Sequence, residues 1–336
     1  MATTMLPAPE LLPDVLPTER LTRTGMPVPE IRAELRRIPG ARNAVTVLVA
    51  HLQAAAVLAG AAWLSHPLAW AAAFVLMGRV FACYAILAHE GAHRLLFAHR
   101  RVNDLVGRWL LAYPAFIPFD AYRRAHMAHH RDELGPGEPD LGLYRGYPTT
   151  WRSMARKLRR DALFVSGWKN LRPLLRALRS PAGRPVALSI LGVQAAVLAA
   201  CAAFGRPELY PLLWLAPWMT VWRVLNRLRA LAEHGGMTRS GDRRLTTHHV
   251  RQGLAARFFM VPYRTGWHLA HHVDMGVPFR NLPRLHAELK AAGWVPDELE
   301  HPTYRALWRR LASAPAPAAA ALAAPADPAP AASGTF

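Results

Sequence analysis

The chain contains little cysteine and little acid. Only two cysteines, Cys83 and Cys201, occur in 336 residues, and both lie in or beside apolar stretches. A disulfide framework and a cysteine-rich zinc or iron–sulfur site are thereby excluded. Asp and Glu number 22 against 41 Lys and Arg, which gives a net charge of +19. Such a charge usually indicates nucleic acid or an anionic membrane surface as a partner.

Charged residues are almost absent from two long stretches. Residues 43–78 contain no Asp, Glu, Lys or Arg, and residues 185–222 contain only Arg206 and Glu208. An ordinary soluble, nucleic-acid-binding domain would not segregate its charges in this way. The positive charge therefore has to be explained together with an apolar, membrane-embedded part.

Each apolar block is long enough for two helices. The first block, residues 44–88, allows two helices of about 20 residues each, with residues 65–67 (Ser-His-Pro) as the turn. The second block, residues 186–222, is broken at residues 205–208 (Gly-Arg-Pro-Glu). The sequence therefore predicts an all-α integral membrane protein with four transmembrane helices in two hairpins.

Basic residues are concentrated on one side of these predicted spans. Eighteen Lys and Arg lie between His89 and Pro185, whereas the two hairpin tips carry none and one, respectively. By the positive-inside rule, both termini and the long middle segment face the cytoplasm, so the chain is expected in an inner or cytoplasmic membrane. The net charge is then a cytosolic face over anionic lipid, and no nucleic-acid partner is expected.

The two ends of the chain differ in composition from the middle. Residues 1–24 are Pro-rich without apolar periodicity, which predicts a disordered leader. Residues 312–336 are a low-complexity Ala/Pro sequence, which predicts a disordered tail. Residues 25–311 remain as one membrane domain with a cytosolic helical cap.

Nine of the sixteen histidines are grouped at recurring spacings. His89 and His93 follow the second span at i, i+4, which places both on one helical face. Two further clusters, residues 126–130 and 268–272, both read H-x-x-H-H, and on a helix these three positions form one compact patch. His234 lies at the cytosolic end of the fourth span. The repeated spacing on one side of the membrane predicts a metal site with these ligands: His89, His93, His126, His129, His130, His234, His268, His271 and His272.

Nine imidazoles are too many for a single ion. Zinc sites take about four ligands, and catalytic zinc sites about three plus water. Two five- or six-coordinate ions fit the number better, and imidazole suits iron among other metals. A cap that holds two irons bridged by water or hydroxide is the expected arrangement for dioxygen chemistry.

Several carboxylates lie close to the histidine clusters in the sequence. Metal-bound histidine commonly donates its second ring N–H to a carboxylate, which fixes the orientation of the ring. Ordinary surface acids are the alternative interpretation. The candidates for this orienting role are Glu90, Asp140 and Glu233, together with Asp132, Glu133 and Glu138.

Residues 89–93 also match H-E-x-x-H, the signature of zinc metallopeptidases in which the Glu is the general base. At the end of a membrane helix this motif would indicate an intramembrane zinc protease, but that interpretation leaves six histidines in two matching clusters unexplained. A carboxylate-rich di-iron site would need two Glu-x-x-His pairs, and only Glu90 and His93 have that spacing near the clusters.

The three histidine clusters resemble those of the integral-membrane fatty-acid desaturase and hydroxylase superfamily. The resemblance extends from about Val45 to Leu289 and includes His-Glu-Gly-Ala-His-Arg at 89–94, His-Met-Ala-His-His-Arg at 126–131 and Trp-His-Leu-Ala-His-His at 267–272. Residues 273–278 (Val-Asp-Met-Gly-Val-Pro) depart from the pattern of many relatives, which puts the substrate in doubt more than the metal.

The resemblance implies a dioxygen-dependent di-iron oxidoreductase that acts on an unactivated C–H bond. His234 occupies the place of an extra ligand that the family commonly uses near the end of the fourth span. Desaturation of a fatty-acyl chain is the expected reaction, with electrons from a separate donor such as a ferredoxin or a b-type cytochrome. A hydroxylase or ketolase that acts on a carotenoid, sphingolipid or alkane is the nearest alternative.

Two arginines predict how far the second and fourth helices extend. Arg79 precedes His89 by ten residues, and Arg223 precedes His234 by eleven. At about 1.5 Å per residue, each arginine lies about 15 Å from its histidine along a helix. The shared offset predicts that both helices continue past the membrane and reach the metals in the cytosol.

Overall fold

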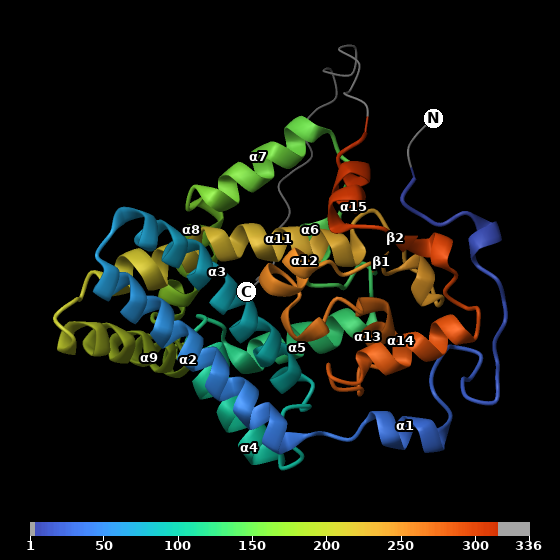
Figure 1. Ribbon diagram of the computed structural model, residues 1–336, viewed down its shortest axis with the longest axis horizontal. Helices are drawn as coiled ribbons and strands as arrows, with labels where there is room; N and C mark the ends of the chain where they lie inside the picture. Colours follow the sequence, from blue (N-terminus) through green and yellow to red (C-terminus); the bar gives the residue numbers. More distant parts are fainter. Residues whose placement is uncertain (1–3, 315–336) are drawn as a thin grey trace.

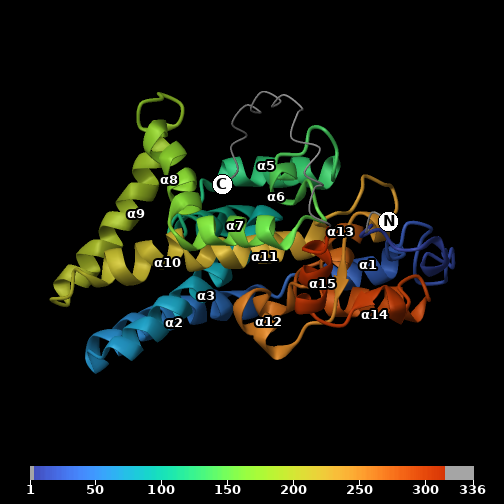
Figure 2. The same ribbon diagram turned by 90° about the horizontal axis from the view of Figure 1, so that it is seen from above.

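The computed structural model describes residues 4–314 and is mostly helical (Figure 1). The long helices α2 (Gly40–Leu64), α3 (Pro67–Ala92) and α9 (Arg184–Ala203) lie on one side, and most of the shorter helices gather on the other (Figures 1 and 2). The only strands among the described residues are β1 (His249–Val250) and β2 (Glu300–His301), a parallel pair of two residues each. The expectation of a helical fold is confirmed.

The first predicted hairpin forms where the sequence places its turn. α2 ends at Leu64, and α3 begins at Pro67. Proline suits this first helical position because its φ is already helical and its missing N–H needs no partner there. His66 caps the helix, because its Nδ1 accepts a hydrogen bond of 3.2 Å from the backbone N–H of Leu68. α3 then continues without a break to Ala92, so His89 lies on the same helix as Arg79.

The fourth apolar segment is helical but interrupted. It consists of the π-helix η3 (Tyr210–Leu215), α10 (Ala216–Met219) and α11 (Val221–His234), with the break at Thr220. Pro217 lies in this segment, and proline cannot donate a helical hydrogen bond. Within residues 4–314, three helical stretches are long and apolar enough to cross a membrane: Pro29–Leu64, Pro67–Ala92 and Arg184–Ala203. The interrupted fourth segment is not among them.

The remaining helices of the described residues are shorter, and α5 and α13 among them carry histidine clusters. Helix α1 (Pro29–Leu35) leads into α2. The other α-helices are α4 (Arg100–Leu105), α5 (Phe119–Arg131), α6 (Leu141–Tyr144), α7 (Trp151–Ala162), α8 (Val165–Ala177), α12 (Leu254–Phe259), α13 (His268–Val273), α14 (Leu282–Ala291) and α15 (Tyr304–Leu311). The π-helix η2 (Val106–Ala112) follows α4, and single 3₁₀ turns occur at η1 (Pro9–Leu11), η4 (Arg243–Leu245), η5 (Pro262–Arg264) and η6 (Asp297–Leu299).

Close contact between α3 and α11 joins the two hairpins. Gly78 of α3 makes this approach possible, because a Cβ at that position would lie 2.2 Å from Cγ1 of Val221. α3 therefore packs directly on α11, and the histidines at the ends of both helices come to the same place. The predicted extension of the second and fourth helices toward the histidine clusters agrees with this packing.

The N-terminal segment packs against the body of the protein. Met5, Leu16 and Leu21 are buried, and Nε of Arg20 donates to Glu288 of α14 at 2.7 Å. These contacts depart from the disordered leader that the composition predicts for residues 1–24, because three apolar side chains spaced along it find places in the core. Of the predicted Ala/Pro tail at 312–336, residues 315–336 lie outside the described part of the chain.

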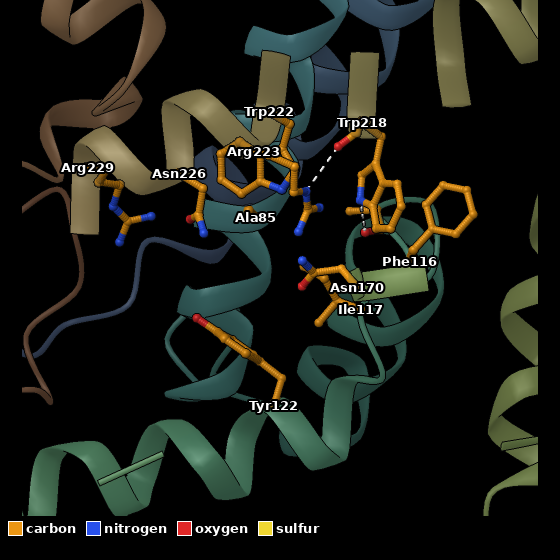
Figure 3. A pocket seen from close by; sticks show the side chains of 11 residues that line it. Ala85, Phe116, Ile117, Tyr122, Asn170, Trp218, Trp222, Arg223, Asn226 and Arg229 are labelled. Carbon is orange, nitrogen blue, oxygen red and sulfur yellow. Dashed lines mark hydrogen bonds between the residues drawn. The ribbon is translucent and has the colours of Figure 1, made fainter. Parts of the chain in front are cut away.

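A small cavity of about 60 Å³ lies between α3, α5, α8 and α11 (Figure 3). Its apolar wall includes Phe116, Ile117 and Trp218, and its polar wall includes Asn170 and Arg223. Tyr122 and Arg229 line the same space (Figure 3). The cavity is therefore amphipathic, and it lies beside the helices that carry the histidines.

Candidate metal centre

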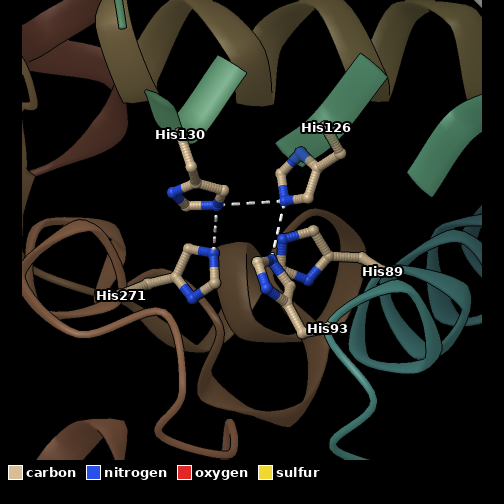
Figure 4. A group of neighbouring side chains, drawn as sticks. All are labelled: His89, His93, His126, His130 and His271. Atoms are coloured by element: carbon tan, nitrogen blue, oxygen red, sulfur yellow. Dashed lines mark hydrogen bonds between the residues drawn. The ribbon is translucent and has the colours of Figure 1, made fainter. Parts of the chain in front are cut away.

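Five histidines from three helices meet in one group (Figure 4). Each offers one ring nitrogen, and these nitrogens lie within 4.8 Å of one another. α3 and its C-terminal cap supply the first two members, α5 the next two and α13 the last. The group consists of His89, His93, His126, His130 and His271.

A second group of four buried histidines lies beside the first. Rings of the two groups are in contact, since the His130 and His272 centroids are 4.4 Å apart. α5 and α11 each supply one member, and α13 supplies two. This group consists of His129, His234, His268 and His272. All nine histidines that the sequence singles out are thus brought together, and His234 joins them from the end of α11.

Each H-x-x-H-H cluster is shared between the two groups. His126 and His130, at i and i+4, belong to the five-histidine group, whereas His129 belongs to the four-histidine group. In the third cluster, positions i and i+4 lie in the four-histidine group and His271 lies in the other. The reason is helical geometry: residues one apart differ in direction by about 100°, and residues four apart nearly coincide. The expected single patch of three nitrogens is therefore divided between two sites.

The separations between ring nitrogens fit two ion-binding sites. Nε2 of His126 lies 2.8 Å from Nε2 of His93 and 3.1 Å from Nε2 of His130. In the other group, Nε2 of His268 lies 3.0 Å from Nε2 of both His234 and His272. Two imidazoles that bind one ion at about 2 Å and at right angles keep their nitrogens about 3 Å apart. The donor sets and their spacing therefore suit metal ions.

Glu133 lies against the Nδ1 atoms of two histidines of the four-histidine group, and the backbone carbonyl of Thr246 also accepts from Nδ1 of His234 at 2.9 Å. Oε1 of Glu133 lies 3.2 Å from Nδ1 of His234, and its Oε2 lies 3.1 Å from Nδ1 of His272. Thr247 donates to Oε1 at 2.9 Å, and Arg243 forms an ion pair with Oε2. With Nδ1 held in this way, Nε2 of each ring points to the interior of the group, as a metal ligand requires.

Two further carboxylates contact the remaining rings of the four-histidine group. Glu138 faces Nδ1 of His129, and Oε1 of Glu233 lies 3.5 Å from Nδ1 of His268. Glu233 is itself held by Arg229, whose Nε donates to it at 2.7 Å. Asp140, also expected to orient a histidine, makes no side-chain hydrogen bond to any of the nine within residues 4–314. Closeness to a cluster in the sequence therefore predicts the orienting carboxylates less well than the packing of η4 and α11 on the clusters does.

Glu90 does not occupy the position of a peptidase base. Its Oε2 accepts a hydrogen bond of 3.3 Å from the backbone N–H of Phe279, and its Oε1 lies 3.9 Å from Nδ1 of His89. A zinc-peptidase glutamate has to reach a metal-bound water on the Nε2 side of the histidines. The arrangement of Glu90 therefore argues against the H-E-x-x-H interpretation.

Burial keeps most of these imidazoles neutral, which is the form that binds metal. Burial, together with the neighbouring His272 and His129, lowers the pKa of His93 to about 3. Burial likewise lowers the pKa of His272 to about 3, although Glu133 opposes that shift. Burial alone would raise the pKa of the Glu133 carboxyl, but His272 and His234 hold it well below its usual range.

The other buried histidines lie outside both groups. Nε2 of His248 contacts the backbone carbonyl of Gly235 at 2.7 Å, so it ties the end of α11 to the following loop. The His249 ring stacks on His286 at 4.4 Å, and Trp267, the residue before the third cluster, stacks on His286 at 4.1 Å. These contacts give His248 and His249 packing roles, as their irregular spacing in the sequence suggests.

The model of the fatty acid desaturase family matches residues 65–304, a range that contains all nine histidines. A dihydrorhizobitoxine desaturase from Bradyrhizobium elkanii is 27% identical over 237 residues, which cover 65% of this chain and 65% of that protein.

Two shorter similarities are to lipid desaturases. An sn-1 acyl-lipid omega-3 desaturase (ferredoxin) from Nostoc sp. (strain 36) is 26% identical over 121 residues, which cover 35% of this chain and 31% of that protein. A Delta(12) fatty acid desaturase from Mortierella isabellina is 33% identical over 64 residues, which cover 19% of this chain and 16% of that protein. The matched part of the chain thus spans less than two thirds of each of these relatives.

Proposed function

The chain belongs to the fatty acid desaturase family of oxidoreductases, and on that premise we propose that it is a dioxygen-dependent di-iron desaturase of an acyl-type substrate. The observation that carries this proposal is the pair of adjacent histidine groups, of five and four members. Five imidazoles exceed the usual four-ligand zinc site, and two adjacent all-imidazole sites suit two irons. When bound, the irons supply dioxygen activation and oxidising power that amino-acid side chains lack.

The protein contributes ligand orientation and a dry, shaped space. Glu133, Glu138 and Glu233 each contact the Nδ1 side of a ring in the four-histidine group, so the opposite nitrogens stay directed inward. The cavity of Figure 3 gives part of the substrate a place next to residues that contact the histidines, because Tyr122 and Arg229 line it. Ala85 and Tyr122 line this cavity and lie one helical turn before His89 and His126, respectively. A bound substrate there is close to the five-histidine group.

Desaturation is favoured over oxygen insertion because the relatives described above are named desaturases. Removal of two hydrogens from adjacent carbons would give a double bond, whereas a hydroxylase or ketolase on the same scaffold would leave oxygen in its product. One of these relatives is named for dihydrorhizobitoxine and the others for fatty acids or acyl lipids. The proposed substrate is accordingly a lipid or other acyl-type molecule delivered from the membrane.

Electrons for this reaction come from a separate donor, either a ferredoxin or a b-type cytochrome. The name of the Nostoc relative includes ferredoxin. The net charge of +19 favours an acidic partner, because opposite charges speed the encounter of two proteins.

We place residues 25–311 in one desaturase-like membrane domain with four spans, both termini in the cytoplasm and the histidine groups in a cytosolic cap. The hairpin tips near Ser65 and Gly205 then face the opposite side of the membrane.

Single-cysteine labelling tests this topology, since both native cysteines are buried. Ser65→Cys should react with an impermeant reagent added outside the cell, and Ser240→Cys should react only after lysis. Labelling of both from outside would contradict the topology.

Product analysis tests the reaction. Cells that produce the wild-type chain should accumulate a product lighter than its precursor by one H₂, only in the presence of dioxygen. Cells that produce His271→Ala at the same membrane level should not, because that variant lacks a ligand of the five-histidine group. A product that gains one oxygen atom would replace the desaturase proposal with the hydroxylase alternative, and shortened membrane proteins without any lipid change would favour a protease.

A further inference from the structure

The cavity beside the metal centre has an unusual polar wall on α11. Arg223, Asn226 and Arg229 all project from this helix into the same space (Figure 3). Asn170 of α8 and Tyr122 of α5 face them from the opposite side (Figure 3). A tunnel that held only hydrocarbon would be expected to have an apolar lining instead, because polar groups covered by hydrocarbon lose their hydrogen bonds with water.

The polar wall connects to the two histidine groups through Tyr122 and Arg229. The ring of Tyr122 stacks on the ring of His126, with centroids 5.6 Å apart. Arg229 contacts Glu233 at 2.7 Å, and Glu233 in turn contacts Nδ1 of His268 at 3.5 Å. A molecule in the cavity therefore touches residues that hold members of both groups.

Arg223 is a buried cation without a carboxylate partner. Its side chain is 9% exposed, and its Nε donates to the backbone carbonyl of Trp218 at 3.1 Å. Its guanidinium carbon lies 4.3 Å from the ring centroid of Trp218. Within residues 4–314, its two terminal nitrogens form neither an ion pair nor a hydrogen bond, and Figure 3 shows them turned into the cavity.

The other two arginines of α11 show the contrast. Arg227 pairs with the buried Asp161, and Arg229 pairs with Glu233. Each of those cations is therefore neutralised within the protein, and Arg223 alone among the three presents an unpaired charge to the cavity. An unpaired buried charge costs several kcal/mol unless a counter-charge reaches it.

We propose that Arg223 binds a carboxylate of the substrate, so that the substrate is a free carboxylic acid rather than an ester or thioester. This inference rests on the proposed function, because it assigns the substrate class of the same site. The two terminal nitrogens of a guanidinium match the two oxygens of a carboxylate. Asn170 and Asn226 offer further hydrogen bonds to polar groups near the carboxylate. A hydrocarbon segment in this place would leave the two terminal nitrogens of Arg223 without a partner.

The position of Arg223 also limits the length of chain between the carboxylate and the reacting carbons. Arg223 precedes Arg229 by six residues on α11, which is about 9 Å along the helix axis. Arg229 already contacts the carboxylate that faces His268. Because Arg223 lies about 15 Å from His234 along this helix, the chain between the carboxylate and the reacting carbons spans a distance of this order.

Equilibrium binding to the purified full-length protein in detergent tests the inference, with octanoate and its methyl ester as matched probes. We expect wild type to bind octanoate about tenfold more tightly than methyl octanoate, the factor expected from a charged hydrogen bond. Arg223→Gln should remove this preference. Arg79→Gln is the matched control, because Arg79 lies on a neighbouring helix but contacts Phe258 and Gln53 instead of the cavity. It should keep the preference.

Equal binding of acid and ester by wild type, or an unchanged preference in Arg223→Gln, would overturn the inference. Should Arg223→Gln fold poorly, the wild-type comparison still decides, and Arg223→Lys should retain part of the preference because it keeps the charge. 2-Aminooctanoate distinguishes two sources of carboxylate: tighter binding than octanoate indicates an amino acid, and weaker binding a fatty acid. Both outcomes support a site at Arg223 that binds a carboxylate.

Iron content and turnover, measured on the same preparation, separate this inference from the proposed function. A preference for the acid in a protein that neither holds iron nor desaturates would leave the carboxylate site standing and remove the desaturase proposal. Efficient desaturation of esters without any preference for acids would remove only the carboxylate site.

Discussion

Oε2 of Glu133 lies 3.1 Å from Nδ1 of His272, and the same carboxylate reaches Nδ1 of His234 with its other oxygen. One carboxylate thus faces half of the four-histidine group, and the backbone carbonyl of Thr246 assists it at His234. Glu133→Gln can accept a hydrogen bond from only one of the two rings, so we expect it to lower iron affinity or activity by about 10–100-fold. Iron titration and product formation measure the loss. Asp132→Asn is the control, because Asp132 contacts the exposed Arg239, and equal losses in both variants would contradict the role of Glu133.

The two histidine groups should differ in their tolerance of a lost ligand. His234→Ala leaves three histidines in its group, whereas His271→Ala leaves four in the other. We therefore expect His234→Ala to lose more bound iron than His271→Ala, although neither variant should be active. Metal analysis of the two purified variants measures the difference. Greater iron loss in His271→Ala would show that the five-histidine group depends on all of its members.

Glu90→Gln distinguishes the di-iron account from H-E-x-x-H proteolysis. A glutamine side-chain oxygen can still accept the hydrogen bond from the backbone N–H of Phe279, so the local structure should persist. We expect measurable dioxygen-dependent turnover in Glu90→Gln and none in His89→Ala or His93→Ala. A Glu90→Gln variant as inactive as the histidine variants, with its iron fully retained, would show that Glu90 takes part in the chemistry.

The ion pair between Asp161 and Arg227 should stabilise the contact of α7 with α11. The Asp161 side chain is 1% exposed and that of Arg227 is 19% exposed. Asp161→Ala leaves a largely buried cation unpaired, which should cost about 3–5 kcal/mol and lower the midpoint of thermal unfolding. Glu208→Ala, which breaks the exposed pair with Arg206, should leave the midpoint unchanged. Equal midpoints for both variants would contradict this ranking.

Local spacing predicts the ligands but not their division. The i, i+4 pairs such as His89 and His93 share a helical face, and this rule alone identifies histidines that bind together. Neighbours such as His129 and His130 point about 100° apart on α5, and each finds a complete group only because rings from α3, α11 and α13 lie on both sides of that helix. That arrangement depends on long-range packing, including the close approach at Gly78, and no local pattern encodes it.

Contacts between distant parts of the chain also decide the structure of the N-terminal segment and of the residues after the third histidine cluster. Asp274 directly follows α13 and contacts Arg32 and Arg36, which lie about 240 residues earlier in the chain. Composition marks residues 1–24 as Pro-rich but cannot show that Leu16 and Leu21 find places in the core. Pro217, by contrast, is a visible local signal for the irregular π-helix η3 directly before it, because proline cannot donate to the carbonyl four residues earlier.

Metal analysis of the purified wild-type chain tests the central claim most directly. The two histidine groups predict about two irons per chain, and removal of iron with a chelator should abolish dioxygen-dependent turnover, which added ferrous iron should restore. A single zinc per chain, with activity retained after iron has been removed, would contradict the di-iron desaturase account.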